Sequence, residues 1–202
     1  MMAPLLRLAT WPPSLAADRR GVATIEFALV APVFLVLLMG MLNVGQVAYG
    51  AAVLNGAVQK AARDSALEGA NTEQADAIVR RLVAPVLPGA TFTSRRTNYY
   101  DYADIGRAER FNDQNGNGNC DPGEVYIDEN RSGQWEREIG RSGNGGASDV
   151  VVYTVEVQFQ PVFRIPLMPE QWRRKVLTAS AIKKNQPYAD QEEYGTNSGV
   201  CT

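Results

Sequence analysis

Residues 27–42 read FALVAPVFLVLLMGML, and this stretch decides the architecture of the chain. It opens a run of 33 positions, 27–59, without Asp, Glu, Lys or Arg. A helix of about 20 apolar residues spans the hydrocarbon core of a bilayer. We therefore predict a membrane-spanning helix. The alternative is a buried core helix, which would normally carry polar residues on one side.

Basic residues lie on one side of this helix only. Arg7, Arg19 and Arg20 precede it, and the next basic residue is Lys60. Positively charged flanks stay in the cytoplasm. The N-terminus is therefore predicted to be cytoplasmic and the remainder of the chain to be exported. A cleaved secretory signal would have a shorter apolar region of about 7–15 residues.

The composition of the 202-residue chain excludes several function classes. It has no histidine and a net charge of −2. Without histidine there is no Ser-His-Asp or Cys-His nucleophile and no His-ligated zinc, so any metal should be bound by oxygen. The charge gives no basic surface for nucleic acid. We expect a protein that is not an enzyme and has no nucleic-acid partner.

The junction before the apolar run, residues 19–27, reads RRGVATIEF. Gly21 lacks a Cβ that would crowd a protease cleft, so it suits a cleavage site. After a cut, Val22 would carry a new ammonium group, and Glu26 would lie one helical turn away to neutralise it, on its own chain or on a neighbour. In the alternative interpretation, Gly21 is a linker and Glu26 only complements the helix dipole.

This junction resembles the type IV prepilin processing site. The following residues, IEFALVAP (25–32), resemble TadE-like minor pilins, or pseudopilins, of the tight-adherence (Flp, type IVc) pilus system. The resemblance covers about residues 19–45. It implies cleavage by a prepilin peptidase between Gly21 and Val22, and a role in assembly for Glu26 and Phe27.

The resemblance also implies a location and partners. The protein would be a single-pass inner-membrane protein with a periplasmic C-terminus, and its incorporation into an extracellular pilus is left open. The implied partners are other pilins and pseudopilins, the prepilin peptidase, the inner-membrane pilus assembly platform and membrane lipid.

A segment rich in Asn, Asp and Gly contains a metal-binding pattern. Residues 113–124 satisfy the EF-hand loop template D-x-N-x-N-G-x5-E, in which short side chains gather hard oxygens about 2.3–2.6 Å from Ca²⁺ and Gly118 supplies the sharp turn. The pattern resembles the short calcium loops of dockerin and thrombospondin type 3 repeats. The candidate calcium ligands are Asp113, Asn115, Asn117, Asn119 through its carbonyl, Asp121 and Glu124.

The pattern recurs fifteen residues later. The second copy has Gly133 at the turn and the candidate ligands Asp128, Asn130, Ser132 and Glu136. Ile139 stands where Glu124 would fall, so we expect this loop to be weaker or empty unless Glu138 or another group substitutes. The alternative for both loops is a solvated segment that binds nothing.

Cys120 and Cys201 are the two cysteines of the chain. On the oxidising side of the membrane they could form one intrachain disulfide, which would attach the C-terminal tail to the loop segment. Two free thiols are the alternative.

The remaining patterns predict an α+β fold. Apolar and small residues spaced three and four apart continue the long helix to about Leu67, and Asn71 is placed to cap a second, short helix. Alternation predicts strands at 151–160, 175–183 and 91–99, forming a small antiparallel sheet with a long calcium-loop insertion. The expected parts are a leader (1–21), a long transmembrane and periplasmic helix (22–69), a second helix and first strand (70–98), the insertion (99–148) and C-terminal strands (149–202).

Three hypotheses for the function follow from these patterns. The main hypothesis is a minor pilin or pseudopilin that acts in the assembly or priming of an adhesive tight-adherence pilus. The second is a single-pass, membrane-anchored periplasmic calcium-binding adhesion or interaction protein that is not part of a pilus. The third is a membrane-bound hydrolase, which would need a cleft with convergent acids.

Overall fold

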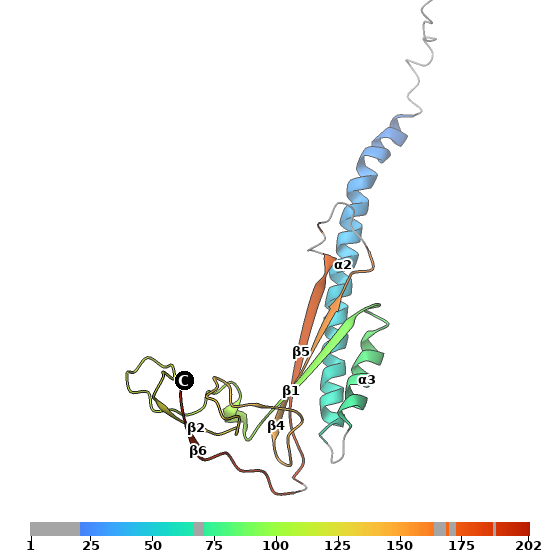
Figure 1. Cartoon of the computed structure of the whole chain (residues 1–202). Coiled ribbons are helices and arrows are strands. Elements are labelled where there is room, and N and C mark those ends of the chain that lie inside the picture. Colours follow the sequence, from blue (N-terminus) through green and yellow to red (C-terminus); the bar gives the residue numbers. More distant parts are fainter. Residues whose placement is uncertain (1–20, 67–70, 164–168, 170–172, 188) are drawn as a thin grey trace, which may run out of the picture.

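The computed structural model describes residues 21–66, 71–163, 169, 173–187 and 189–202 (Figure 1). The predicted leader lies outside the described residues except for Gly21. The fold is α+β, as predicted: a long N-terminal helix and a short helix lie against a small antiparallel sheet.

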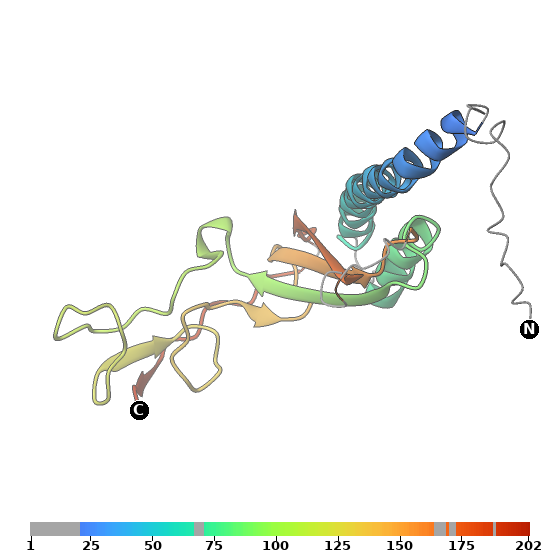
Figure 2. The ribbon, with the colours of Figure 1, turned by 90° about the horizontal axis from the view of Figure 1, so that it is seen from above.

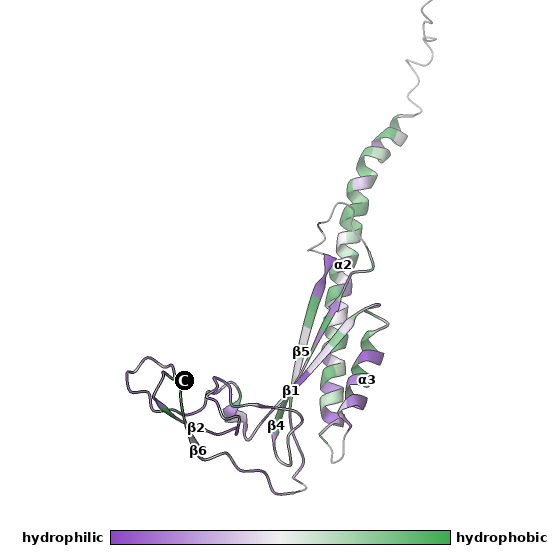
Figure 3. Cartoon of the chain, in the orientation of Figure 1, coloured by the Kyte–Doolittle hydropathy of each residue, from purple (hydrophilic) through white to green (hydrophobic). Residues whose placement is uncertain are grey.

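Helix α2 (Val22–Asp64) has two parts with different surroundings. Its first half is apolar and exposed, and Phe27 and Leu29 are each 73% exposed. Figure 3 shows that this apolar end projects beyond the sheet. Its buried residues begin only at Gly50. The helix has the length and hydropathy to cross a membrane, and it fits a single-pass membrane anchor.

Helix α2 ends at Asp64, slightly before the predicted end near Leu67, which is itself not described. Ser65 leaves the helical conformation, and its carbonyl accepts a hydrogen bond from Lys183 Nζ at 2.5 Å. A buried ammonium thus binds a carbonyl that the end of the helix leaves free.

Helix α3 (Thr72–Val83) begins where the sequence predicts. The Asn71 side chain accepts hydrogen bonds from the N–H groups of Glu73 (2.8 Å) and Gln74 (3.2 Å), which confirms the N-cap. The helix ends at Val83, before Pro85 can interrupt its hydrogen bonding.

The main sheet has the strand order β3-β1-β4-β5, and all of its pairings are antiparallel. The three predicted strands are confirmed as β1 (Thr91–Tyr99), β4 (Val150–Phe159) and β5 (Lys175–Lys184), and β3 (Arg141–Ser142) is a short addition. The helices cover one face of the sheet (Figures 1 and 2). The core between the layers includes Leu54, Val58, Val79, Val83, Leu87, Tyr153, Val155 and Val157.

The insertion between β1 and β4 forms a second lobe beside this body (Figure 1). It contains the 3-10 helix η1 (Tyr102–Asp104) and strand β2 (Val125–Asp128). Strand β2 pairs antiparallel with β6 (Asn197–Val200), so the C-terminal tail crosses from the sheet to the insertion.

Candidate functional site

The predicted cleavage junction lies at the first turn of α2. Gly21 is the N-cap residue, and its carbonyl accepts the N–H of Ile25 at 3.2 Å. A Cβ added to Gly21 would meet nothing within 4 Å, so the fold itself does not require a glycine at this position. Val22, Glu26 and Phe27 are all exposed. The described part of the junction, from Gly21 on, is therefore exposed to another protein or to the edge of a bilayer.

In the first candidate loop, Asp113 organises the backbone. Its carboxylate accepts hydrogen bonds from the N–H groups of Gly116 (2.7 Å), Asn117 (3.2 Å) and Gly118 (2.8 Å). The bond from Gly118 contributes most to lowering the pKa of Asp113. Gly118 has φ +75°, a conformation that favours glycine. The predicted sharp turn is therefore present.

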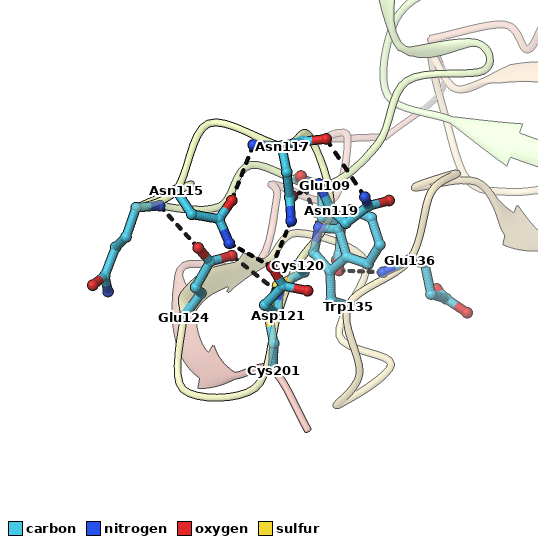
Figure 4. Close-up of a disulfide and its surroundings, with 11 residues drawn as sticks. Glu109, Asn115, Asn117, Asn119, Cys120, Asp121, Glu124, Trp135, Glu136 and Cys201 are labelled. Carbon is cyan, nitrogen blue, oxygen red and sulfur yellow. Dashed lines mark hydrogen bonds between the residues drawn. A yellow bond between two sulfur atoms is a disulfide. The ribbon is translucent and has the colours of Figure 1, made fainter.

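Three side chains of this loop converge on one point. The amide groups of Asn115 and Asn117 donate to the same Oδ2 of Asp121, at 2.6 and 2.7 Å (Figure 4). These residues occupy loop positions 3, 5 and 9. A half-turn of each amide would present oxygen instead of nitrogen at that point. In this structure the two amide oxygens accept the N–H groups of Asn117 (3.0 Å) and Asn119 (2.7 Å), so the residue types match the ligands that Ca²⁺ prefers but the atoms at that point do not.

The end of the first loop is closed by Glu124, which is 5% exposed. One carboxylate oxygen accepts the N–H of Gln114 (2.9 Å) and the other accepts the N–H of Asp121 (3.0 Å). Asn119 receives a hydrogen bond from Arg137 on its side-chain oxygen at 2.5 Å, which leaves its backbone carbonyl as the predicted ligand atom.

The second loop repeats the local structure of the first. Asp128 accepts from the N–H groups of Ser132 and Gly133, each at 2.9 Å, and Gly133 has φ +79°. The Asn130 amide donates to Glu136 as Asn115 donates to Asp121. Ser132 Oγ donates to the Gln134 carbonyl at 2.9 Å.

The expected substitute for the missing carboxylate does not take that position. Glu138 accepts a hydrogen bond from the Tyr99 hydroxyl, and Ile139 is buried. Instead, Glu109, which no sequence pattern singled out, contacts the second loop and is 1% exposed. Burial raises the pKa of its carboxyl above the ordinary value. No local spacing marks Glu109, because it precedes both loops in the chain.

A buried carboxylate, paired with two more exposed arginines, holds the second loop to the preceding segment. Glu129 is bound by Arg107 (2.8 Å) and Arg110 (3.0 Å). Burial alone would raise the pKa of Glu129, but the hydrogen bonds from these two arginines outweigh burial and lower it to about 2. The loop is thus held in place by charge as well as by backbone pairing.

Cys120 and Cys201 are joined by a disulfide in the structure, with their Cα atoms 5.8 Å apart (Figure 4). The backbone pairs at the same place: Gly123 N–H donates to the Cys201 carbonyl (3.0 Å), and Cys201 N–H donates to the Glu124 carbonyl (2.9 Å). The C-terminal tail is therefore attached to the end of the first loop.

The described ranges contain no group of three or more Asp, Glu, Cys or His side chains gathered for a metal ion. The three acids of the first loop, Asp113, Asp121 and Glu124, are therefore not gathered at one point in this structure, and the other candidate ligands of this loop are amide and backbone oxygens. The second loop offers two acids, one amide and one hydroxyl.

Comparison with known proteins bears on the N-terminal part of the chain. No curated protein and no solved structure matches. Residues 21–63 match the family model of TadE-like proteins. The match begins at Gly21, includes Val22, Glu26 and Phe27, and ends one residue before α2 does. Residues 21–63 of this chain are therefore similar to TadE-like proteins.

Proposed function

We propose that the protein is a minor pilin, or pseudopilin, that acts in the assembly or priming of a tight-adherence (Flp, type IVc) pilus used for adhesion. The observation that carries this proposal is the TadE-like match over residues 21–63, which coincides with a helix that is bare in one half and packed in the other. TadE-like proteins form a pilus-associated family and not an enzyme family.

The exposed half of α2 would provide the assembly surface. Phe27, Leu37 and Met41 are 73%, 68% and 76% exposed, which is costly in water and favourable in lipid or between apolar helices. Lipid of the inner membrane would cover this surface first. The helices of other pilins and pseudopilins would then replace the lipid, guided by the inner-membrane assembly platform.

Processing would supply the register for assembly. A prepilin peptidase would cut between Gly21 and Val22, leaving the leader in the cytoplasm and the C-terminal part in the periplasm. The new Val22 ammonium and the Glu26 carboxylate, one turn apart on an exposed helix, would then form a charge pair within a chain or between neighbours.

The two loops would bind calcium and stiffen the lobe that faces away from the membrane. The convergence of Asn115, Asn117 and Asp121 supports this role for the first loop. An exposed lobe held by Ca²⁺ and a disulfide would suit adhesion outside the membrane.

Mass spectrometry of the mature N-terminus tests the processing step. We expect a chain that begins at Val22 in cells with the peptidase and an uncut chain in cells without it. Gly21→Leu should block the cut. Gly40→Leu, at another glycine of α2 where an added Cβ would also meet nothing within 4 Å, should leave it intact. A wild-type chain that stays uncut would favour the alternative, a membrane-anchored periplasmic calcium-binding adhesion protein outside any pilus.

A second measurement addresses the role in the fibre. Sheared pili and the membrane fraction should both be probed for the mature chain, and a minor pilin should copurify with other pilins in at least one of them. A processed chain that copurifies with no pilin would overturn the assembly proposal.

A further inference from the structure

The first loop shows how its last residue closes the ring. Glu124 is at position 12. One of its carboxylate oxygens accepts a hydrogen bond from the N–H of Gln114 at position 2, and the other accepts one from the N–H of Asp121 at position 9. The carboxylate thus joins the beginning of the loop to its end. In the EF-hand pattern the same residue supplies the bidentate ligand.

The second loop has an isoleucine at position 12, yet the same two contacts are made. Glu109 Oε1 accepts a hydrogen bond from the N–H of Glu129, at position 2, at 2.9 Å. Glu109 Oε2 accepts one from the N–H of Glu136, at position 9, at 3.2 Å. Glu109, from a separate segment, therefore makes the same two backbone contacts with the second loop that Glu124 makes with the first.

Backbone pairing holds Glu109 in this position. The N–H of Glu109 donates to the Glu136 carbonyl and the N–H of Ile139 donates to the Arg107 carbonyl, both at 3.0 Å. The indole N–H of Trp135 donates to the Glu109 carbonyl at 3.1 Å. The segment that carries Glu109 thus runs antiparallel to the end of the second loop.

Three backbone N–H groups donate to the Glu109 carboxylate, but no positive side chain pairs with it among the described residues. The nearby arginines, Arg107 and Arg110, bind Glu129 instead. A carboxylate that is 1% exposed is costly without a positive partner. Asp128 and Glu136 add negative charge to the same loop.

We infer that Glu109 is the missing carboxylate of the second loop, so that the chain carries two complete sites for an oxygen-preferring divalent cation, the second assembled from two separate segments. This inference rests on the calcium binding proposed for the loops. From the sequence, the second loop was expected to be weaker or empty. With Glu109 as its ligand, the loop receives the missing carboxylate from a segment that precedes it in the chain.

Calcium titration of the full chain in detergent, after removal of metal with a chelator, tests the inference. Calorimetry should give two sites per wild-type chain, one after Glu109→Gln and one after Glu124→Gln. Glu138→Gln is the matched control, because this acid is at position 11 of the second loop but binds Tyr99 instead, and this variant should keep two sites. Glutamine preserves the size and one acceptor oxygen, and far-UV circular dichroism in chelator would show that each variant folds.

Luminescence of bound Tb³⁺ assigns the site that is lost. Trp135 lies at position 8 of the second loop and lines one pocket with Cys120 of the first, so energy transfer from this tryptophan reports Tb³⁺ in both loops. Glu109→Gln should weaken the apparent affinity of one component of the signal by more than about tenfold, and Glu124→Gln should weaken the other component. The component that remains in each variant identifies the loop that still binds.

The outcomes separate this inference from the proposal on which it rests. A single wild-type site that Glu124→Gln abolishes and Glu109→Gln spares would overturn the role of Glu109 and keep calcium binding by the first loop. Two sites that both persist in Glu109→Gln would also overturn it. A wild-type chain that binds no calcium would remove both the calcium proposal and the inference, and would leave the pilin proposal standing.

Discussion

Arg96 on β1 and Asp76 on α3 form a short ion pair, with 2.6 Å between Nη2 and Oδ1, and their side chains are only 10% and 18% exposed. The same guanidinium lies 4.2 Å from the centroid of the Tyr153 ring, whose hydroxyl donates to Asp76 at 2.6 Å. This network attaches α3 to the sheet at its centre. It combines an ion pair, a cation–π contact and a hydrogen bond around one carboxylate.

Replacement of Asp76 should therefore destabilise the fold in a pH-dependent way. Burial raises the pKa of Asp76, but the hydrogen bonds from Arg96, Tyr153 and Ser94 outweigh burial and lower the pKa below 3.8. The ionised Asp76 carboxylate stabilises the folded state. This contribution is fully present above pH 3.8, the pKa of the unfolded chain, and is lost as the pH falls through the lower pKa of the folded state. Asp76→Asn should cost about 3 kcal/mol at pH 7 and flatten the acid side of the stability curve.

Thermal unfolding of the full chain in detergent, at pH 7 and at several values below pH 4, measures this effect. Asp64→Asn is the control, because the Lys60–Asp64 pair is about half exposed and should contribute less than about 0.5 kcal/mol. Equal losses for the two variants would contradict the role assigned to Asp76.

The two halves of α2 should respond differently to the same substitution. Leu54 is fully buried against the sheet, whereas Leu37 on the same helix is 68% exposed. Leu54→Ala should lower the free energy of unfolding by about 2–5 kcal/mol, because it leaves a cavity. Leu37→Ala should change it little. Denaturant unfolding followed by tyrosine fluorescence compares them, and a larger loss for Leu37→Ala would mean that the exposed half packs on the fold.

The disulfide should matter for the lobe more than for the helix and sheet. It closes a sequence separation of 81 residues, so its loss should destabilise the lobe by up to about 4 kcal/mol in the chain-entropy account. Cys120→Ser with Cys201→Ser should release β6 and expose 113–136 to proteases, while α2 and the main sheet remain resistant. Alkylation of the unreduced wild-type chain should label no thiol; two labelled cysteines would show that the bond is absent.

Sequence patterns predicted those parts of this fold that depend on interactions within a short segment. The alternation in β4 reflects one face packed on the helices, and Asn71 caps α3 through bonds to its own neighbours, so both were readable from short segments. The pairing of β2 with β6 was not. Strand β6 reads NSGV, too short and too polar to show alternation, and its partner lies far away in sequence.

The same contrast applies to the candidate sites. The first loop carries all its candidate ligands within twelve consecutive residues, so its template was visible in the sequence. The second loop shows its gap at Ile139 but not the group that fills it. Glu109 reaches the loop because its own segment pairs with the end of the loop, Glu109 with Glu136 and Arg107 with Ile139, and no spacing rule encodes this long-range contact.

Removal of the Glu26 carboxylate should separate processing from assembly. Glu26 lies one turn after Val22 on the exposed end of α2, so Glu26→Ala leaves Gly21 and the fold unchanged but removes the partner of the new ammonium group. We expect normal cleavage between Gly21 and Val22 together with a reduced amount of the chain in complexes with other pilins.

Glu73→Ala, at an exposed acid in the first turn of α3, is the control and should affect neither step. Mass spectrometry of the N-terminus and crosslinking in the membrane fraction measure the two steps. Unchanged crosslinking of a correctly cleaved Glu26→Ala chain would show that the charge pair does not set the register, and would leave the apolar surface of α2 as the determinant of assembly.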